Sequence, residues 1–235
     1  MTETAMKSSI SPGRAKVVEQ VVLSVQTAGL RKMAIASVDT DPASRTLAVQ
    51  VAAVAAGSGR RTLLIDLADG GEGGHWHPGK SDAPVGKDAA GRGFDTLSAP
   101  DDEEGRAAFN NPSRISEALD GLLETYDLVL LHASGLITDG AWPVNPIAAC
   151  AATEGVVMVL PVGEVPAQKL ERSVALLEAA GARVVGTVID DRGNPSLGDD
   201  MARGAERVFS FAPPIGRWLA KKLRGSDFLR TPIFQ

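Results

Sequence analysis

The sequence has little cysteine, no long apolar run and no surplus of positive charge, and each shortage argues against a class of protein. Cys150 is the only cysteine, so no disulfide can form within the chain. No apolar run reaches the length of about 20 residues that a membrane-spanning helix needs. The N-terminal segment also lacks the apolar core of a signal peptide. We therefore expect a cytoplasmic protein.

The charge balance argues against general nucleic-acid binding. Lys and Arg number 24 against 29 Asp and Glu, which gives a net charge of −5, whereas nucleic-acid binding relies on basic side chains that neutralise phosphates. With 235 residues and 44% hydrophobic content, the chain is long enough for one sizeable α/β domain with an ample core.

The chain is organised around residues 33–69. Residues 33–38 form an apolar run that predicts a strand, and apolar residues then recur at helical spacing up to Gly57. Residues 62–67 predict a second buried strand. Strand, loop, helix and strand in this order form a right-handed unit, whose helix N-terminus holds phosphate in many α/β proteins. The architecture is that of a nucleotide-binding cradle.

The residues in this cradle do not match a working phosphate loop. Such a loop has the form G-x-x-x-x-G-K-[ST], in which glycines wrap the phosphates, lysine contacts them and the hydroxyl holds Mg²⁺. Alignment on the flanking strand and helix places Val38 and Ala43 at the glycines and Ser44 at the lysine. Arg45 falls at the metal-binding hydroxyl, and only Thr46, one position later, keeps its residue type.

Three segments carry a resemblance to a known family: LLID at 63–66, YDLVLL at 126–131, and the strand, helix and strand pattern of 155–191. Over residues 15–212 their order is similar to that of the ATPase domain of bacterial tyrosine kinases of capsule and exopolysaccharide systems, relatives of the MinD/ParA partitioning ATPases. The resemblance implies an α/β three-layer sandwich with a mostly parallel sheet, of the P-loop NTPase type.

The carboxylates that hold Mg²⁺ in this family are altered here. Asp66 matches the first acid of the family's D-x-D pattern, but Ala68 replaces the second acid and Asp69 comes one position late. His132 stands where the family has the Walker B aspartate, and imidazole is a poor partner for a hard cation such as Mg²⁺. We interpret His132 as a histidine that forms hydrogen bonds at a strand end.

The expected site is therefore a remnant of a nucleotide cradle, with no catalytic residues and no metal ligands. Its residues are Asp41, Ser44, Arg45, Thr46 and Asp66. We expect no cofactor. The alternative is that ATP and Mg²⁺ still bind, with Arg45 in place of the lysine, because guanidinium binds phosphate well.

Features that the family uses for assembly and phosphorylation are also missing. Its first helix carries E-x-x-R-x-x-R, which joins subunits into a ring, whereas Val22 and Val25 stand at the arginine positions here. Homo-oligomerisation is therefore left open. Active members end in a run of tyrosines, but no tyrosine follows Tyr126.

The predicted domain organisation has three parts. We expect a flexible arm at 1–14, the degenerate ATPase-like domain at 15–212 and a basic, apolar tail at 213–235. The tail has the composition of a segment that docks on an anionic membrane surface or in a partner's groove, and packing on its own domain is the alternative.

Residues 70–104 predict a long polar loop that holds two misleading motifs. The segment 74–81, GHWHPGKS, matches the phosphate-loop pattern letter for letter, but it does not directly follow a strand and the residues after it are not helical. We interpret it as a chance match. His75 and His77 suggest a metal, but two ligands on a loop are too few, so we expect a solvent-exposed tract.

The remaining predicted elements follow from apolar periodicity and capping residues. They are helices at 17–25, 112–124, 166–180 and 201–209, strands at 126–132, 155–161 and 183–189, and a connecting stretch at 136–153.

Together these features predict a pseudo-kinase or pseudo-ATPase. We expect it to bind the cytoplasmic segments of an inner-membrane polysaccharide co-polymerase, as a regulatory or scaffolding partner in bacterial exopolysaccharide biosynthesis and export. It would be cytoplasmic, with peripheral contact to the inner membrane through the tail. The alternative function is an active tyrosine kinase or ParA-like ATPase with divergent Walker motifs.

Overall fold

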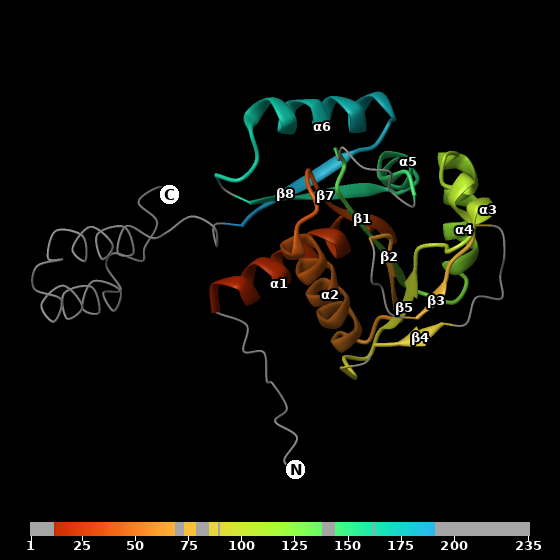
Figure 1. Cartoon of the computed structure of the whole chain (residues 1–235). Helices are drawn as coiled ribbons and strands as arrows, with labels where there is room; N and C mark the ends of the chain where they lie inside the picture. Colours follow the sequence, from red (N-terminus) through yellow and green to blue (C-terminus); the bar gives the residue numbers. More distant parts are fainter. Residues whose placement is uncertain are drawn as a thin grey trace, which may run out of the picture. The chain divides into compact units, whose positions relative to one another are not determined.

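A computed structural model describes residues 12–68, 73–78, 85–88, 90–137, 144–161 and 163–190 (Figure 1). The predicted helix at 201–209, the domain end at 212 and the tail at 213–235 lie outside the described residues. Of the predicted arm at 1–14, only the last residues are described. They already belong to the first helix, which begins at Pro12, because proline is well tolerated in a first helical turn.

Helices and strands alternate along most of the described chain. Their bounds are α1 Pro12–Thr27, β1 Lys32–Ser37, α2 Pro42–Gly57, β2 Thr62–Asp66, β3 Gly74–His75, β4 Gly86–Lys87, β5 Asp95–Ser98, α3 Glu103–Ala108, α4 Pro112–Leu122, β6 Leu128–Ser134, α5 Pro146–Ala151, β7 Gly155–Pro161, α6 Ala167–Ala179 and β8 Val184–Asp190. No helix among the described residues has both the length and the apolar character needed to cross a bilayer.

The strands form one sheet in the order β3-β5-β2-β6-β1-β7-β8, and β4 pairs with β5. β1 pairs in parallel with both β6 and β7, and β2 pairs in parallel with β5 and β6. β4 is antiparallel to β5. The predicted α/β fold with a mostly parallel sheet is confirmed. All these elements, apart from the last residues of β7 and β8, belong to one compact unit.

Helices cover both faces of the sheet, which gives the predicted three layers. On one face, apolar residues of α1 and α2 pack against Ile35, Leu64 and Leu130. On the other, residues of α4, α5 and α6 pack against Leu63 and Leu131. Figure 1 shows α1 and α2 on one side of the strands and α6 on the other. Because successive residues of a strand point to opposite faces, the central strands are apolar at nearly every position.

The prediction of an unbroken polar loop at 70–104 was wrong, because this stretch adds strands to the sheet. It contains β3, β4 and β5, and β5 lies directly beside β2. Phe94 and Leu97 are buried in the two cores. Gly74 and His75 form β3, so the look-alike of a phosphate loop begins on an extended strand, and its end at 79–81 lies outside the described residues.

Two further stretches differ from the prediction. The tract around His75 and His77 is not simply exposed, because Trp76 is only 2% exposed and packs edge-on against Phe109 with ring centroids 5.5 Å apart. The connecting stretch at 136–153 contains the short helix α5. Asn145 caps this helix by accepting hydrogen bonds from two backbone N–H groups.

Candidate functional site

The candidate site lies where β1, β2 and β6 end and α2 begins. These strands are parallel neighbours, so their carboxyl ends meet at one edge of the sheet, which is where open α/β sheets bind ligands. Ser37, Asp66 and His132 come from these three strand ends, and Asp66 is in register with His132. All three side chains are buried.

The N-terminus of α2 is capped from within the chain. Asp41 is the N-cap residue, and its Oδ1 accepts a hydrogen bond from the Ala43 N–H at 2.8 Å, while Pro42 occupies the first turn. In a phosphate-binding protein, the ligand satisfies the N–H groups and the dipole of such a helix. Here the Asp41 carboxylate takes that role and adds a negative charge that repels phosphate.

The loop from β1 to α2 lacks the backbone shape of a phosphate cradle. No residue from 38 to 46 has a positive φ angle, and the segment contains no glycine. Anion-binding nests need residues that alternate between right-handed and left-handed conformations. Val38 and Ala43, at the two glycine positions, are 0% and 3% exposed, so their side chains pack into the cores instead.

A buried chain of hydrogen bonds joins Ser44, His132 and Asp66. Ser44 Oγ lies 3.0 Å from His132 Nε2, and His132 Nδ1 donates to Asp66 Oδ1 at 2.7 Å. The three residues are 0%, 2% and 4% exposed. The prediction that His132 forms hydrogen bonds is confirmed, but β6 continues to Ser134, so His132 lies two residues before the strand end. Ser44 stands at the family's lysine position, His132 at its Walker B acid and Asp66 at its first D-x-D acid. Here His132 contacts both of the other two side chains.

This chain has the order of a Ser-His-Asp triad, but its geometry does not provide a nucleophile. A catalytic serine must reach a substrate while its histidine takes the proton. Ser44 is fully buried, and its hydroxyl donates its single proton to the Asp41 carbonyl oxygen at 2.7 Å rather than to His132. The arrangement therefore serves packing and hydrogen bonding rather than acyl transfer.

Arg45 and Thr46 both lie in the first turns of α2. Arg45 Nε donates to Asp66 Oδ2 at 2.7 Å, and the Arg45 side chain is 45% exposed. Thr46 Oγ1 donates to the Pro42 carbonyl oxygen at 2.7 Å. Burial acts to raise the pKa of the Asp66 carboxyl, but hydrogen bonds and charge from His132 and Arg45 outweigh it and leave this pKa below its ordinary value.

A cleft of about 310 Å³ beside the cradle is lined by Arg45, Asp66, Asp88 and Arg92, among others. Asp88 accepts from the backbone N–H of Arg92 at 2.8 Å and from its Nε at 2.9 Å, which lowers the pKa of the Asp88 carboxyl. Each arginine of the cleft is therefore paired with a carboxylate. Such a cleft presents little net positive charge to a triphosphate.

A lysine does reach the loop, but it comes from a different element. Lys169 of α6 forms an ion pair with Asp39, between β1 and α2. Sequence reasoning missed this contact because the two residues are 130 positions apart and no motif joins them. The pairing leaves the β1–α2 loop without the lysine that a phosphate loop directs at its ligand.

The structure brings together three of the five predicted site residues. Ser44 and Asp66 are joined through His132, and Arg45 binds Asp66. The Asp41 carboxylate and the Thr46 hydroxyl instead contact backbone groups at the α2 N-terminus. The residues present do not fit Mg-ATP as the family binds it, because the cation positions, the glycine positions and the Walker B carboxylate have other side chains and other partners.

The strand order and the cradle at the sheet edge define an α/β domain with the fold of bacterial tyrosine kinase domains. The kinase domain of the Escherichia coli tyrosine kinase ETK is similar with a TM-score of 0.63 and 17% identity, over 78% of this chain and 78% of that chain. The BceF tyrosine kinase domain is similar with a TM-score of 0.57 and 19% identity, over 74% of each chain.

An enzyme of another class shares the fold. The cobyrinic acid a,c-diamide synthase from Mycobacterium smegmatis, with bound ADP and magnesium, has a TM-score of 0.53 and 19% identity, over 69% of this chain and 76% of that chain. At these identities the similarity shows the fold. No family model and no curated protein matches the sequence.

Proposed function

We propose that this protein is a non-catalytic relative of the bacterial tyrosine kinase domains. It acts as a regulatory or scaffolding partner of an inner-membrane polysaccharide co-polymerase, in exopolysaccharide biosynthesis and export. The observation that carries this proposal is the buried contact of Ser44 with His132 and of His132 with Asp66. In a working site of this fold, a lysine and two carboxylates at these positions face phosphate and Mg²⁺.

The physical reason is electrostatic. Phosphoryl transfer depends almost entirely on positioning the phosphate and on stabilising the charge of the transition state. In this cradle, Arg45 and Lys169 already bind carboxylates, and the carboxylate of Asp41 caps the helix. A bound triphosphate would have to separate these pairs and would find no Walker B carboxylate to hold its magnesium.

The proposed partner follows from the resemblance to tyrosine kinases of capsule and exopolysaccharide systems. Active members of the family that the sequence resembles bind the cytoplasmic face of a membrane polysaccharide co-polymerase, and we propose that this protein keeps that binding without the chemistry. We propose a cytoplasmic protein, with peripheral membrane contact through the basic, apolar segment at 213–235.

Calorimetric titration of the full chain with Mg-ATP tests the loss of nucleotide binding. We expect no saturable heat and no ATP hydrolysis, under conditions in which the E. coli ETK kinase domain serves as the positive control. In a second arm, the full chain is expected to bind immobilised cytoplasmic segments of the co-polymerase from the same organism, but not scrambled segments. Absence of this binding would contradict the scaffolding role.

The second candidate function is an active ATP-binding kinase or ParA-like ATPase. The exposed Arg45, at the edge of a cleft of about 310 Å³, favours it, since guanidinium binds phosphate well. In that case Mg-ATP binds saturably, Arg45→Ala abolishes the binding, and Arg114→Ala at an exposed position on α4 leaves it unchanged. This outcome would overturn the pseudo-enzyme assignment.

A further inference from the structure

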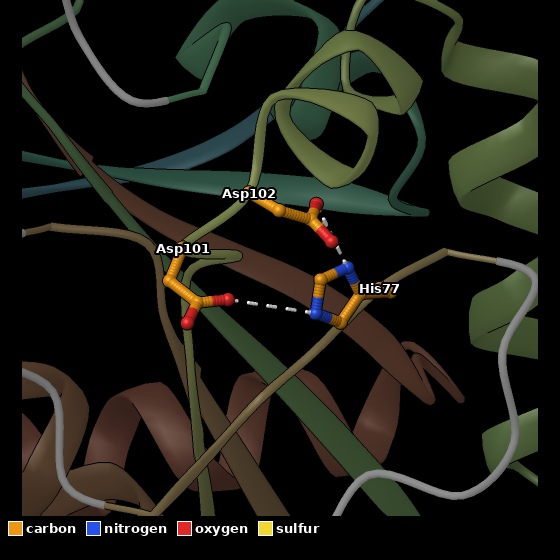
Figure 2. A group of neighbouring side chains, drawn as sticks. All are labelled: His77, Asp101 and Asp102. Carbon is orange, nitrogen blue, oxygen red and sulfur yellow. Dashed lines mark ion pairs between the residues drawn. The ribbon is translucent and has the colours of Figure 1, made fainter.

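We propose that His77, Asp101 and Asp102 bind a divalent transition-metal ion of the Zn²⁺ class (Figure 2). The cluster is separate from the nucleotide cradle and independent of the function proposed above. His77 follows β3, and the two aspartates lie between β5 and α3. The sequence offered two histidines on an apparent loop, and the fold adds two carboxylates from a segment more than 20 positions away.

The spacing of the ligand atoms fits one ion. One ligand atom from each of the three residues lies within 4.8 Å of the others. His77 Nδ1 is 3.4 Å from Asp102 Oδ1, and these two atoms are the pair closest to a shared ion. Asp101 Oδ1 lies 3.9 Å from the other ring nitrogen, Nε2. Because one ion binds one ring nitrogen, the 64% exposed Asp101 side chain would turn toward Nδ1 to complete the site. Both distances exceed the range of about 2.7–3.2 Å for N–H···O hydrogen bonds. Ligands bound to Zn²⁺ at about 2.0–2.2 Å each lie roughly 3–3.5 Å from one another in a tetrahedral site.

One buried ring nitrogen of the His77 imidazole is not satisfied by a hydrogen bond within the part of the chain that the structure describes. The His77 side chain is only 16% exposed, and the Nδ1 atom has no hydrogen-bond partner among the described residues. A buried ring nitrogen in that state has lost its hydration without replacement, which is costly. A metal ion coordinated by this imidazole and the neighbouring carboxylates restores the missing interaction.

The backbone around the cluster is shaped to leave room for it. A Cβ atom at position 105 would lie 2.8 Å from Asp102 Oδ1 and closer still to His77 Nδ1. Gly105 is thus the residue that allows α3 to approach the imidazole. The Gly105 N–H also donates to Asp102 Oδ1 at 2.6 Å, and such hydrogen bonds orient the carboxylates that bind metals.

The two segments that meet at the cluster are anchored to the sheet. The Trp76 N–H donates to the Ser98 carbonyl oxygen at 2.9 Å, and the Trp76 ring is buried against Phe109. His77 therefore directly follows the anchored Trp76, and Asp101 lies three residues after the end of β5. Binding sites that are supported by strands and buried anchors hold their geometry better than sites on free loops.

His75 is positioned as a further ligand. Its Nδ1 lies 2.6 Å from the Ala99 carbonyl oxygen, which accepts a hydrogen bond, so Nδ1 carries the proton. His75 Nε2 then faces Asp101 Oδ2 at 3.7 Å. A metal-binding histidine commonly donates its other ring N–H to a carbonyl in this way. Imidazole and carboxylate ligands together favour Zn²⁺ and similar ions over Mg²⁺, which prefers oxygen ligands.

The test is a titration of the full chain with Zn²⁺ alone, after a chelator has removed bound metal. We expect one Zn²⁺ per chain by calorimetry and no comparable binding of Mg²⁺. The chain has three histidines, so NMR of the imidazole rings resolves the site. The His77 ring signals are expected to shift on Zn²⁺ binding, whereas His132, buried between Ser44 and Asp66, is the internal control.

Variants identify the ligands. Asp101→Asn changes a 64% exposed side chain and so preserves the fold, and it is expected to lower Zn²⁺ affinity at least about tenfold. His77→Gln is expected to do the same, and Glu103→Gln, at an exposed neighbouring acid, is the matched control with unchanged affinity. The proposal is overturned if the chain does not bind Zn²⁺, if Asp101→Asn and His77→Gln both bind it unchanged, or if the His132 signals shift in place of those of His77.

Discussion

Both carboxylate oxygens of Asp66 bind other side chains, whereas an aspartate at this position of a nucleotide site faces metal-bound water. Its Oδ1 accepts from His132 and its Oδ2 from Arg45, each at 2.7 Å, and the residue is 4% exposed. Both contacts favour the ionised carboxylate and lower its pKa against the effect of burial. The carboxylate therefore stabilises the folded state only while it carries its charge.

Asp66→Asn is expected to lower the free energy of unfolding by about 2 kcal/mol or more at pH 7, because a buried ion pair loses one partner. The folded pKa of Asp66 lies below the ordinary value of 3.8, so its contribution is complete above that pH and is lost as pH falls through the folded pKa. Urea unfolding across this pH range is the measurement. Glu171→Gln, at an exposed position on α6, is the control, with an effect within about 0.5 kcal/mol. An effect of Asp66→Asn that stays constant from pH 7 into the acid range would contradict this account.

At the scale of elements, the predictions succeeded where a long stretch has a clear period and failed where it is short. The apolar run of β7 and the amphipathic pattern of α6 gave bounds within one residue of the structure. The strand β5 has only the four residues DTLS, three of them polar or charged, and α5 has only PIAACA. Neither is long enough to show a period, and their place is decided by packing against β2 and β6.

In the nucleotide cradle, the sequence predicted which family residues are replaced but not the contacts that the replacements form. Comparison with the phosphate-loop pattern identified which side chains are missing at Val38 and Ser44, and comparison with the family's Walker B strand did the same at His132. Both steps need only local register. They did not identify what each replacement binds, since contacts such as Lys169 with Asp39 join different elements. The carboxylates near His77 were missed for the same reason, as the pairing of β3 with β5 brings them together.

The N-terminus of α2 gives a prediction at this scale. Asp41→Ala is expected to destabilise the protein by about 1 kcal/mol, because the Ala43 N–H loses its acceptor. Asp41→Asn keeps an acceptor and removes the charge, so its smaller loss reports the interaction with the helix dipole. Asn111→Ala, at the equivalent cap of α4, is the matched control with a loss of similar size. Denaturant unfolding of the three variants measures these differences, and an Asp41→Ala variant as stable as the unchanged protein would show that the cap contributes nothing.

For the molecule as a whole, stability depends on two apolar layers that share the central strands. Leu130 and Leu131 are adjacent on β6 and both 0% exposed, yet Leu130 belongs to the core under α1 and α2, and Leu131 to the core under α4, α5 and α6. Both cores pack against the same sheet, one on each of its faces. Damage on either side is therefore expected to affect the folding of the entire unit.

Leu130→Ala and Leu131→Ala are each expected to cost about 2–5 kcal/mol, since each leaves a cavity in a closely packed layer. Val185→Ala on β8, where the side chain is 40% exposed, is expected to cost less than about 1 kcal/mol. Thermal and denaturant unfolding of the three variants provide the comparison. If only one of the two leucines proves costly, the other helical layer does not contribute to the stability of the sheet.

The contact between His132 and Asp66 also constrains which substitutions the cradle can accept. His132→Asp alone would place a second carboxylate beside a buried one, and like charges at hydrogen-bond distance repel strongly. Ser44→Lys alone would place an ammonium group against the imidazole. Each single substitution is therefore disfavoured on its own, so a lysine at position 44 and an aspartate at position 132 are expected to be tolerated only when they are introduced together.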